Sequence, residues 1–420
     1  MKGVGGPAGL PVWVLGRTAL LLWVCGVAGF PGPDVTVDVS VIYRGWYETL
    51  RAGSFPAGDV TWQYPPGAAL AVLAPGLLPF LGYAPAFYLL TLLCDAAVLL
   101  LLGRAARLPG GSVRGVWVWI AGVPLLGPTA YARYDLMVTA VAVAALVLGA
   151  GRPRVLGALA GLGALLKVWP LLLLSGVGRG RASRAALVAA GVTASAVALP
   201  LLLALPGAAG FWTAQRDRGT EVESLGGLVL HLARWFGWAG EVRLHYGSVE
   251  FLGPGVALVS AGALVLAGAA LGWLLLWRHR DARTGAAVVP DAAFTAVLLF
   301  TVTSRVISPQ YLVWLVGLAA VCLCARASAM ARPAGLVLLA TGVTVLEFPV
   351  FFARVTASDP LGVGLLALRN GLLVAAAVLA CRALWRGRAA RGSLPAGTGD
   401  QAGAGDQGGA GGQGVSRPVR

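Results

Sequence analysis

Charged residues are scarce in this chain. Only 12% of its 420 residues are Asp, Glu, Lys or Arg, whereas 58% are hydrophobic, and the mean hydropathy is +0.80. A soluble globular protein carries about 25% charged residues. The shortage excludes a soluble enzyme and, for most of the chain, intrinsic disorder, which requires a polar composition. The composition predicts an all-α, polytopic membrane protein.

Cysteine and lysine are also scarce. The five cysteines all lie in or beside apolar runs, and Cys322 and Cys324 have no second ligand pair that would complete a metal site. We therefore expect no disulfide scaffold, no metal and no cofactor. The net charge of +15 would suit a nucleic-acid-binding protein only if it clustered on a solvated domain. The sequence has no such domain, so we expect no nucleic acid partner.

What the sequence has in abundance is long apolar runs. A helix needs about 20 mostly apolar residues to cross the hydrocarbon core. Ten runs approach this length, and we expect the first to be a retained span rather than a cleaved signal peptide. They lie at about 11–30, 84–103, 115–130, 135–150, 185–206, 254–277, 286–303, 311–325, 333–350 and 361–381.

Arginines next to these runs indicate the topology, because positive charges beside spans mark the cytoplasmic side. The six basic clusters are Arg104/Arg107/Arg114, Arg152/Arg154, Arg179/Arg181/Arg184, Arg278/Arg280/Arg283, Arg326/Arg332 and Arg382/Arg386/Arg388/Arg391. All six clusters can lie in the cytoplasm only under two conditions. The segment 66–103 must cross the membrane once in total, and the segment 155–175 must enter the membrane and leave it on the same side.

Two segments are therefore expected to form broken or re-entrant hairpins. Pro75, Pro79 and Gly82 interrupt the first segment, and Pro170 interrupts the second. Such backbone is tolerated at membrane depth where it is buried in protein or lines a cavity. The alternative is two ordinary spans with one basic loop outside. The prediction is about ten full spans plus one or two broken hairpins; the run GALAGLG at 157–163 is expected to be a small-residue packing face.

The outer loops hold most of the acids, so we expect the chemistry to face the extracytoplasmic side of the cell membrane. Within the transmembrane domain, 1–390, the two long outer loops are 31–65 and 207–252, and the shorter ones are 131–135, 304–311 and 351–360. The segment VIYRGWYETLRAG suits a helix lying in the membrane interface. Residues 391–420, rich in Gly, Ala and Gln, are expected to be a disordered cytoplasmic tail.

A few ionisable residues lie at or inside membrane depth, where they are costly and by default indicate a functional site. Arg133 and Asp135 adjoin the start of one span; they are equally compatible with a local ion pair. Arg305 lies between two spans without an adjacent acid, which favours an anionic ligand. Lys167 has three alternatives: its ammonium reaches the headgroups, pairs with Asp95 or another buried acid, or contacts a lipid phosphate.

A set of short motifs in a fixed order resembles glycosyltransferase family 87 from about residue 15 to 350. The matching pieces are Asp38 with Tyr43, Tyr64-Pro65-Pro66, Arg133-Tyr134-Asp135, Lys167-Val168-Trp169-Pro170 and Ser308-Pro309-Gln310-Tyr311. The family consists of integral-membrane GT-C enzymes similar to the polyprenol-phosphate-mannose-dependent mannosyltransferases of actinobacteria. The resemblance thus implies a GT-C fold and a polyprenyl-phosphate sugar donor. It also implies a glycolipid or glycan acceptor and the lipid bilayer as partners.

The resemblance also implies roles for individual residues. Asp38, favoured over Asp34, would be the general base of an inverting displacement in which a hexose, mannose in the family, leaves its phosphate. Arg305 first, Arg133 second and also Lys167 would bind the donor phosphate. The expected substrate-binding residues are Tyr43, Tyr64, Asp135, Gln310 and Tyr311.

Two other functions remain compatible with the sequence. A multi-pass transporter or lipid flippase would typically show internal repeats and charged sites near the membrane midplane. The sequence shows no convincing repeat, and its polar motifs gather at one face. A purely structural membrane subunit would not need Asp38, Arg133 and Arg305 together.

Overall fold

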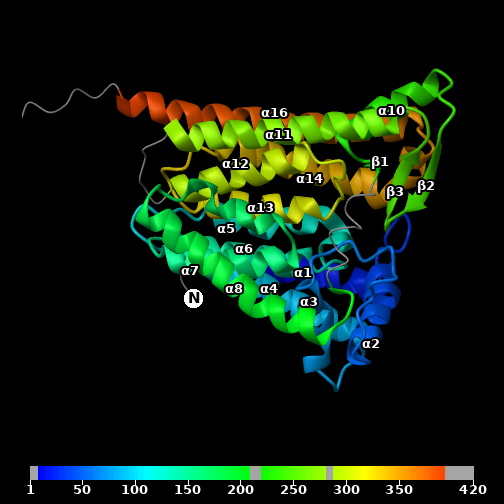
Figure 1. The fold of residues 1–420 in the computed structure, drawn as a ribbon, viewed down its shortest axis with the longest axis horizontal. Helices are drawn as coiled ribbons and strands as arrows, with labels where there is room; N and C mark the ends of the chain where they lie inside the picture. The colour runs from blue at the N-terminus through cyan, green and yellow to red at the C-terminus, as the bar shows by residue number, and fades with distance from the viewer. Residues whose placement is uncertain (1–7, 209–218, 281–286, 393–420) are drawn as a thin grey trace, which may run out of the picture.

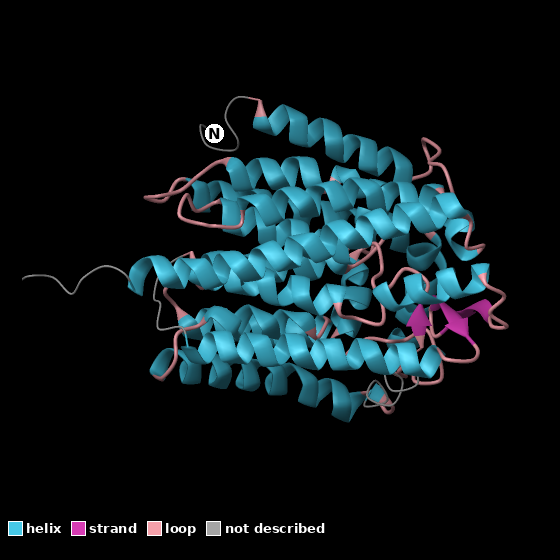
Figure 2. Ribbon diagram, turned by 90° about the horizontal axis from the view of Figure 1, so that it is seen from above, coloured by secondary structure: helices cyan, strands magenta, loops and turns pink. Residues whose placement is uncertain are grey.

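The computed structural model describes residues 8–208, 219–280 and 287–392 of the chain, with side chains up to residue 386. The predicted tail, 391–420, lies outside the described residues except for its first two positions, which continue the last helix. Within the described ranges the chain is a helical bundle with one small sheet (Figure 1; Figure 2). The prediction of an all-α polytopic membrane protein is confirmed.

Five described helices are long and apolar enough to cross a membrane. They are α4 (Tyr83–Ala106), α8 (Arg181–Ala204), α11 (Val256–Arg280), the Ala331–Val350 stretch that begins with α14 (Ala331–Val345), and the Pro360–Arg386 part of α16 (Pro360–Gly392). Six apolar helical stretches are shorter: α1 (Gly9–Val24), Ala68–Leu77 with α3 (Ala68–Leu73), α6 (Asp135–Leu148), α7 (Pro153–Leu166), α12 (Val288–Val302) and α13 (Tyr311–Leu323). Several predicted spans are therefore interrupted rather than continuous.

Both segments that were expected to break do so. In the first, α3 runs into a 3₁₀ turn, Ala74–Leu77, that contains Pro75, and helix resumes only at Tyr83. In the second, α7 ends at Leu166 and a 3₁₀ helix follows from Trp169 to Gly176. Proline causes these breaks because it lacks a backbone donor and clashes with the preceding turn. Lys167 lies at the second break in an extended conformation.

A small sheet, which the sequence reasoning did not predict, lies at one end of the bundle (Figure 1). Its antiparallel strands are β1 (Thr220–Glu221), β2 (Glu241–His245) and β3 (Ser248–Leu252), in the order β1-β3-β2. The same end holds α10 (Leu225–Trp235) and α2 (Arg44–Arg51), the latter within the predicted interfacial segment. The carboxyl end of α16 lies at the opposite end of the bundle.

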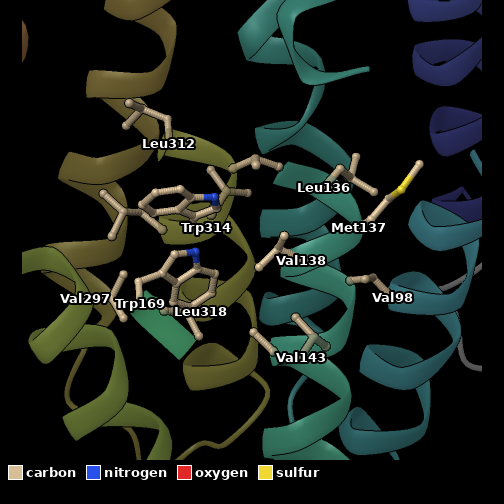
Figure 3. Close-up of a cluster of buried hydrophobic side chains, with 14 of the residues drawn as sticks. Val98, Leu136, Met137, Val138, Val143, Trp169, Val297, Leu312, Trp314 and Leu318 are labelled. Atoms are coloured by element: carbon tan, nitrogen blue, oxygen red, sulfur yellow. The ribbon is translucent and has the colours of Figure 1, made fainter. Parts of the chain in front are cut away.

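The helices pack through small and aromatic residues. A Cβ on Gly157 of α7 would lie 2.0 Å from the Ala186 carbonyl oxygen of α8, so the predicted small-residue packing face is confirmed. Figure 3 shows the aromatic part of the core, where Trp314 of α13 and Trp169 lie together beside α6. Their rings stack with centroids 5.2 Å apart.

A buried ion pair inside the bundle joins α1 to α4. The Asp95 carboxylate accepts hydrogen bonds from the Arg17 guanidinium (Nε to Oδ2, 2.9 Å), from the indoles of Trp13 and Trp119, and from the Tyr131 hydroxyl. Because its charge is compensated and its oxygens are satisfied, Asp95 has a structural role. It is not the partner of Lys167.

His231 fastens α10 to the turn before α16. Its Nε2 lies 3.0 Å from the Val222 carbonyl oxygen, which can only accept, so Nε2 carries the proton. Its Nδ1 therefore accepts a hydrogen bond from the Ser358 hydroxyl at 2.7 Å, and the Ser358 oxygen accepts one from Arg234. Burial lowers the pKa of His231 to about 4, and Arg234 adds to this effect. The folded protein therefore holds this imidazole neutral.

We predict that this histidine makes the fold sensitive to mild acid. Between about pH 6.5 and pH 4 the unfolded chain binds a proton on His231 and the folded chain does not, so stability falls as pH falls. The loss reaches about 3 kcal/mol for a shift of this size. Thermal unfolding of the detergent-solubilised protein as a function of pH measures it.

His231→Gln should flatten that part of the pH profile. His279→Gln is the matched control, because His279 is exposed in the last turn of α11 and its replacement should leave the profile unchanged. Equal pH profiles for wild type and His231→Gln would contradict the prediction.

Candidate active site

One hollow at the sheet end of the bundle brings most of the predicted site residues together. Its volume is about 160 Å³. Six of the nine predicted residues line it: Asp38, Tyr64, Arg133, Lys167, Gln310 and Tyr311. The rest of the lining consists of Thr61, Gln63, Glu221, Glu223, Leu244, Tyr246, Gly247, Ser248, Val249, Ser308, Pro309, Phe348 and Phe352.

Asp38 is paired with Arg133 across the hollow wall. Its Oδ2 lies 2.9 Å from Nη2 of Arg133, and the Asp38 side chain stays 31% exposed. Nη1 of Arg133 donates to the carbonyl oxygens of Val35 and Ala132, which fixes the guanidinium. The alternative of a local pair between Arg133 and Asp135 is therefore wrong.

The local backbone explains why Asp38 can reach the hollow. Asp38 opens a π-helical turn, Asp38–Tyr43, and such turns re-aim side chains and occur frequently at functional sites. Asp34, the other candidate base, instead accepts from the backbone and hydroxyl of Thr36 and borders a different hollow. Of the two carboxylates, only Asp38 lines the hollow that holds Arg133 and Lys167.

Lys167 pairs with Asp135. The helix α7 ends just before Lys167, and its Nζ lies 2.7 Å from Oδ1 of Asp135, which also accepts from the Trp314 indole at 2.8 Å. The ammonium is buried and has the rings of Tyr64, Tyr134, Tyr311 and Trp314 within 5.0 to 5.3 Å. Such cation–π contacts are strongest where water is excluded.

Two predicted binding residues lie behind the hollow instead of lining it. Asp135 is buried beneath Lys167. Tyr43 is buried as well, with its ring stacked on Trp46 at 5.3 Å and edge-on to Tyr134 at 5.9 Å. Their position is that of supports for Lys167 and for the aromatic wall.

The loop between α12 and α13 ends at Gln310, directly before Tyr311, the first residue of α13. An acid that the sequence reasoning missed holds this loop in place. Both oxygens of Glu221 are used: Oε2 accepts from the Ile307 amide at 2.7 Å and Oε1 from the Ser308 hydroxyl at 3.0 Å. The Glu221 amide also donates to the Arg305 carbonyl oxygen. The Arg305 side chain is outside the residues that line the hollow, and its phosphate-binding role stays a prediction.

A second missed acid, Glu223, also lines the hollow. It is 4% exposed and lies with Glu347 around Arg369, whose Nη1 is 3.9 Å from Glu223 Oε1 and 3.6 Å from Glu347 Oε2. Burial, followed by the charges of Glu347 and Glu221, raises the pKa of Glu223 well above its usual range. The only sequence signal for this cluster was a pair of isolated charges, Glu347 and Arg369, within apolar helices.

The described residues contain no group of three or more His, Cys, Asp or Glu side chains placed to hold a metal ion. The hollow instead combines the carboxyl groups of Asp38, Glu221 and Glu223 with two cations and several aromatic rings. This donor set suits an anionic, hydroxyl-rich ligand, because arginine and lysine bind phosphate and aromatic rings pack on apolar ring faces.

We predict that replacing Lys167 alone lowers the free energy of unfolding more than replacing Lys167 and Asp135 together. Lys167→Met leaves the Asp135 charge buried and should destabilise the protein by about 3–5 kcal/mol. The double variant Lys167→Met, Asp135→Asn should recover most of this loss, because no lone buried charge remains. Thermal unfolding in detergent compares the wild type, Lys167→Met, Asp135→Asn and the double variant. Additive effects of the two substitutions would contradict the pairing.

The chain is similar in sequence to one family of known proteins. The sequence model of glycosyltransferase family 87 matches residues 62–309, which is more than half of the chain and includes Tyr64, Arg133, Asp135, Lys167 and Arg305. Asp38 and Tyr43 precede the matched range, and Gln310 and Tyr311 directly follow it. No curated protein and no solved structure matches the chain.

Proposed function

The chain belongs to glycosyltransferase family 87 and is therefore a membrane glycosyltransferase, and we propose that its donor is a polyprenyl-phosphate hexose, with mannose as the sugar. In this proposal the acceptor is a glycolipid or a glycan. The observation that carries the proposal is that Asp38, Arg133 and Lys167 border one hollow although they lie far apart in the sequence.

Asp38 would be the general base. Arg133 holds its Oδ2, so the acceptor proton would pass to Oδ1 as the acceptor oxygen attacks the anomeric carbon. The bond between the anomeric carbon and the phosphate oxygen breaks, and polyprenyl phosphate leaves with the electron pair. A phosphate monoester is a good leaving group, so the reaction needs no acid to protonate it. A single displacement inverts the anomeric configuration.

Arg133 and Lys167 would stabilise the charge that develops on the departing phosphate. Each already has a carboxylate partner, so the phosphate would share a cation that is held in position rather than organise a mobile one. Because Lys167 is buried among aromatic rings, its field is little screened by water. Arg305, in the loop that carries Gln310, would reach the donor from the same side.

The arrangement of charge supports an extracytoplasmic site in the cell membrane. The hollow is lined partly by residues of β2 and β3, and β3 leads into α11, which ends with Arg278, His279 and Arg280. The basic end of α11 therefore lies one helix length from the hollow. Since basic helix ends stay in the cytoplasm, the hollow would face outward.

We predict that Asp38→Asn abolishes transfer without unfolding the protein. Loss of a general base typically lowers the rate about 10²- to 10⁴-fold. The measurement is transfer of radiolabelled mannose from polyprenyl phosphate to lipid in membranes that contain the protein, with thermal unfolding as the check on folding.

Asp34→Asn is the matched control, because Asp34 precedes Asp38 in the same loop and borders a different hollow. It should leave the rate within a few-fold of wild type. Loss of transfer in Asp34→Asn but not in Asp38→Asn would assign the base to Asp34. Uptake of labelled lipid into proteoliposomes without any transfer would favour a transporter.

A further inference from the structure

The hollow has lining residues that the proposed displacement does not use. They come from the turn between β2 and β3, from the segment after β1, and from the end of the Ala331–Val350 helix with the helix that follows it. The relevant side chains are Glu223, Tyr246, Phe348 and Phe352. These elements differ from those that carry Asp38, Arg133 and Lys167, so the hollow has a second wall of its own.

Glu223 is the polar part of this wall. Its Oε1 is buried and accepts no hydrogen bond within the described part of the chain, and the nearest Arg369 nitrogen, at 3.9 Å, is beyond hydrogen-bond distance. Its backbone is fixed, because its carbonyl oxygen accepts from Arg369 and Asn370. An unsatisfied buried polar atom costs about 1–3 kcal/mol, and Glu347 is the neighbouring acid that interacts with the Glu223 carboxyl group.

Glu221 and Glu223 use their carboxylate oxygens differently. Both glutamates come from the same short segment and line the same hollow. Glu221 uses both carboxylate oxygens to hold the Ile307–Ser308 backbone and hydroxyl, whereas Glu223 has one oxygen left over. Holding the loop before α13 in place therefore accounts for Glu221, whereas Glu223 interacts with Glu347 and Arg369 and also lines the hollow.

Tyr246 is the aromatic part, and it occupies a position that its backbone disfavours. His245 pairs with Ser248, so Tyr246 and Gly247 form a two-residue hairpin turn, with φ of 46° and 75°. Such turns favour Asn-Gly, because both residues need positive φ. A tyrosine there costs on the order of 1 kcal/mol, and strain of this kind gathers at functional sites. The tyrosine places an aromatic ring in the wall of the hollow.

We propose that Glu223 and Tyr246 bind the sugar ring of the acceptor. The Glu223 carboxyl group hydrogen-bonds to the ring hydroxyls, and the Tyr246 ring packs on the apolar face of the sugar, with Phe348 and Phe352 completing the apolar side. The acceptor is therefore a glycoside and not a simple lipid alcohol. This inference rests on the proposed function, because it assigns the second substrate of the same hollow.

The protonation of Glu223 fits this role. Because burial and the neighbouring acids raise its pKa, the group is a neutral carboxylic acid until the pH rises toward that value. A neutral carboxylic acid both donates and accepts a hydrogen bond. It also adds no negative charge beside a donor phosphate. Arg369 opposes the effect, and Glu347 and Glu221 add to it.

The test separates transfer to a sugar from transfer to water. Labelled polyprenyl-phosphate mannose is the donor, octyl α-mannoside is the acceptor probe, and release of free mannose reports donor cleavage by water. Glu223→Leu and Tyr246→Ala should raise the KM for octyl α-mannoside about tenfold to a hundredfold, the size of one or two lost polar or packing contacts. Release of free mannose and the KM for the donor should change little.

Conservative and control variants sharpen the result. Glu223→Gln keeps a donor and an acceptor and should stay within a few-fold of wild type, as should Tyr246→Phe, which keeps the ring. Glu241→Gln is the control, because Glu241 is exposed on β2 and does not line the hollow. Tyr246→Asn should raise the thermal midpoint by relieving the strained turn and still raise the acceptor KM.

The outcomes distinguish the two proposals. If the wild-type protein consumes no polyprenyl-phosphate mannose, the proposed function fails. If it cleaves the donor but transfers nothing to octyl α-mannoside, or if Glu223→Leu and Tyr246→Ala leave the acceptor KM unchanged, the acceptor site is overturned while the proposed function stands. If both variants lose donor cleavage, transfer and thermal stability together, the two residues have a structural role. That result would also overturn the proposed acceptor site.

Discussion

The ion pair between Lys167 and Asp135 is the constraint on which the centre of this protein depends. Neither charge could stay ionised alone at this depth, because desolvation would cost several kcal/mol per ion. Asp135 opens α6, Lys167 follows α7, and Trp314 lies in the first turn of α13 and donates to the same carboxylate oxygen. One oxygen atom thus fixes where three helix ends meet.

The place where these helix ends meet determines the positions of the residues that line the hollow. Arg133 lies two residues before Asp135 and therefore emerges beside it, but its guanidinium turns to Asp38. The aromatic rings that surround Lys167 also form part of the wall. Charges at the hollow are thus compensated in pairs, and this arrangement permits two cations and several acids to coexist where water is scarce. Glu223 differs from these pairs because its nearest cation, Arg369, is 3.9 Å away and is shared with Glu347.

The small sheet completes the site from outside the bundle. Its first strand carries Glu221, which anchors the loop that presents Gln310 and Tyr311, and the turn between the other two strands carries Tyr246. The first outer segment and the ends and breaks of the helices thus supply the charged wall, and the small sheet supplies part of the wall proposed for the acceptor. In the proposed function, the first of these walls would bind the donor and the second would bind the acceptor.

The sequence by itself determined the membrane class, the helix breaks at Pro75 and before Pro170, and six residues that line the hollow. These features depend on local properties: run length, proline chemistry and short motifs. Only the tertiary structure decided which charges pair. Arg133 and Asp135 are neighbours in the sequence, yet each bonds to a distant residue, because the fold aims the two side chains at different partners. The isolated charges of Glu347 and Arg369 in apolar helices did not identify their partners, since the cluster that they form with Glu223 comes from three separate segments that only packing brings together.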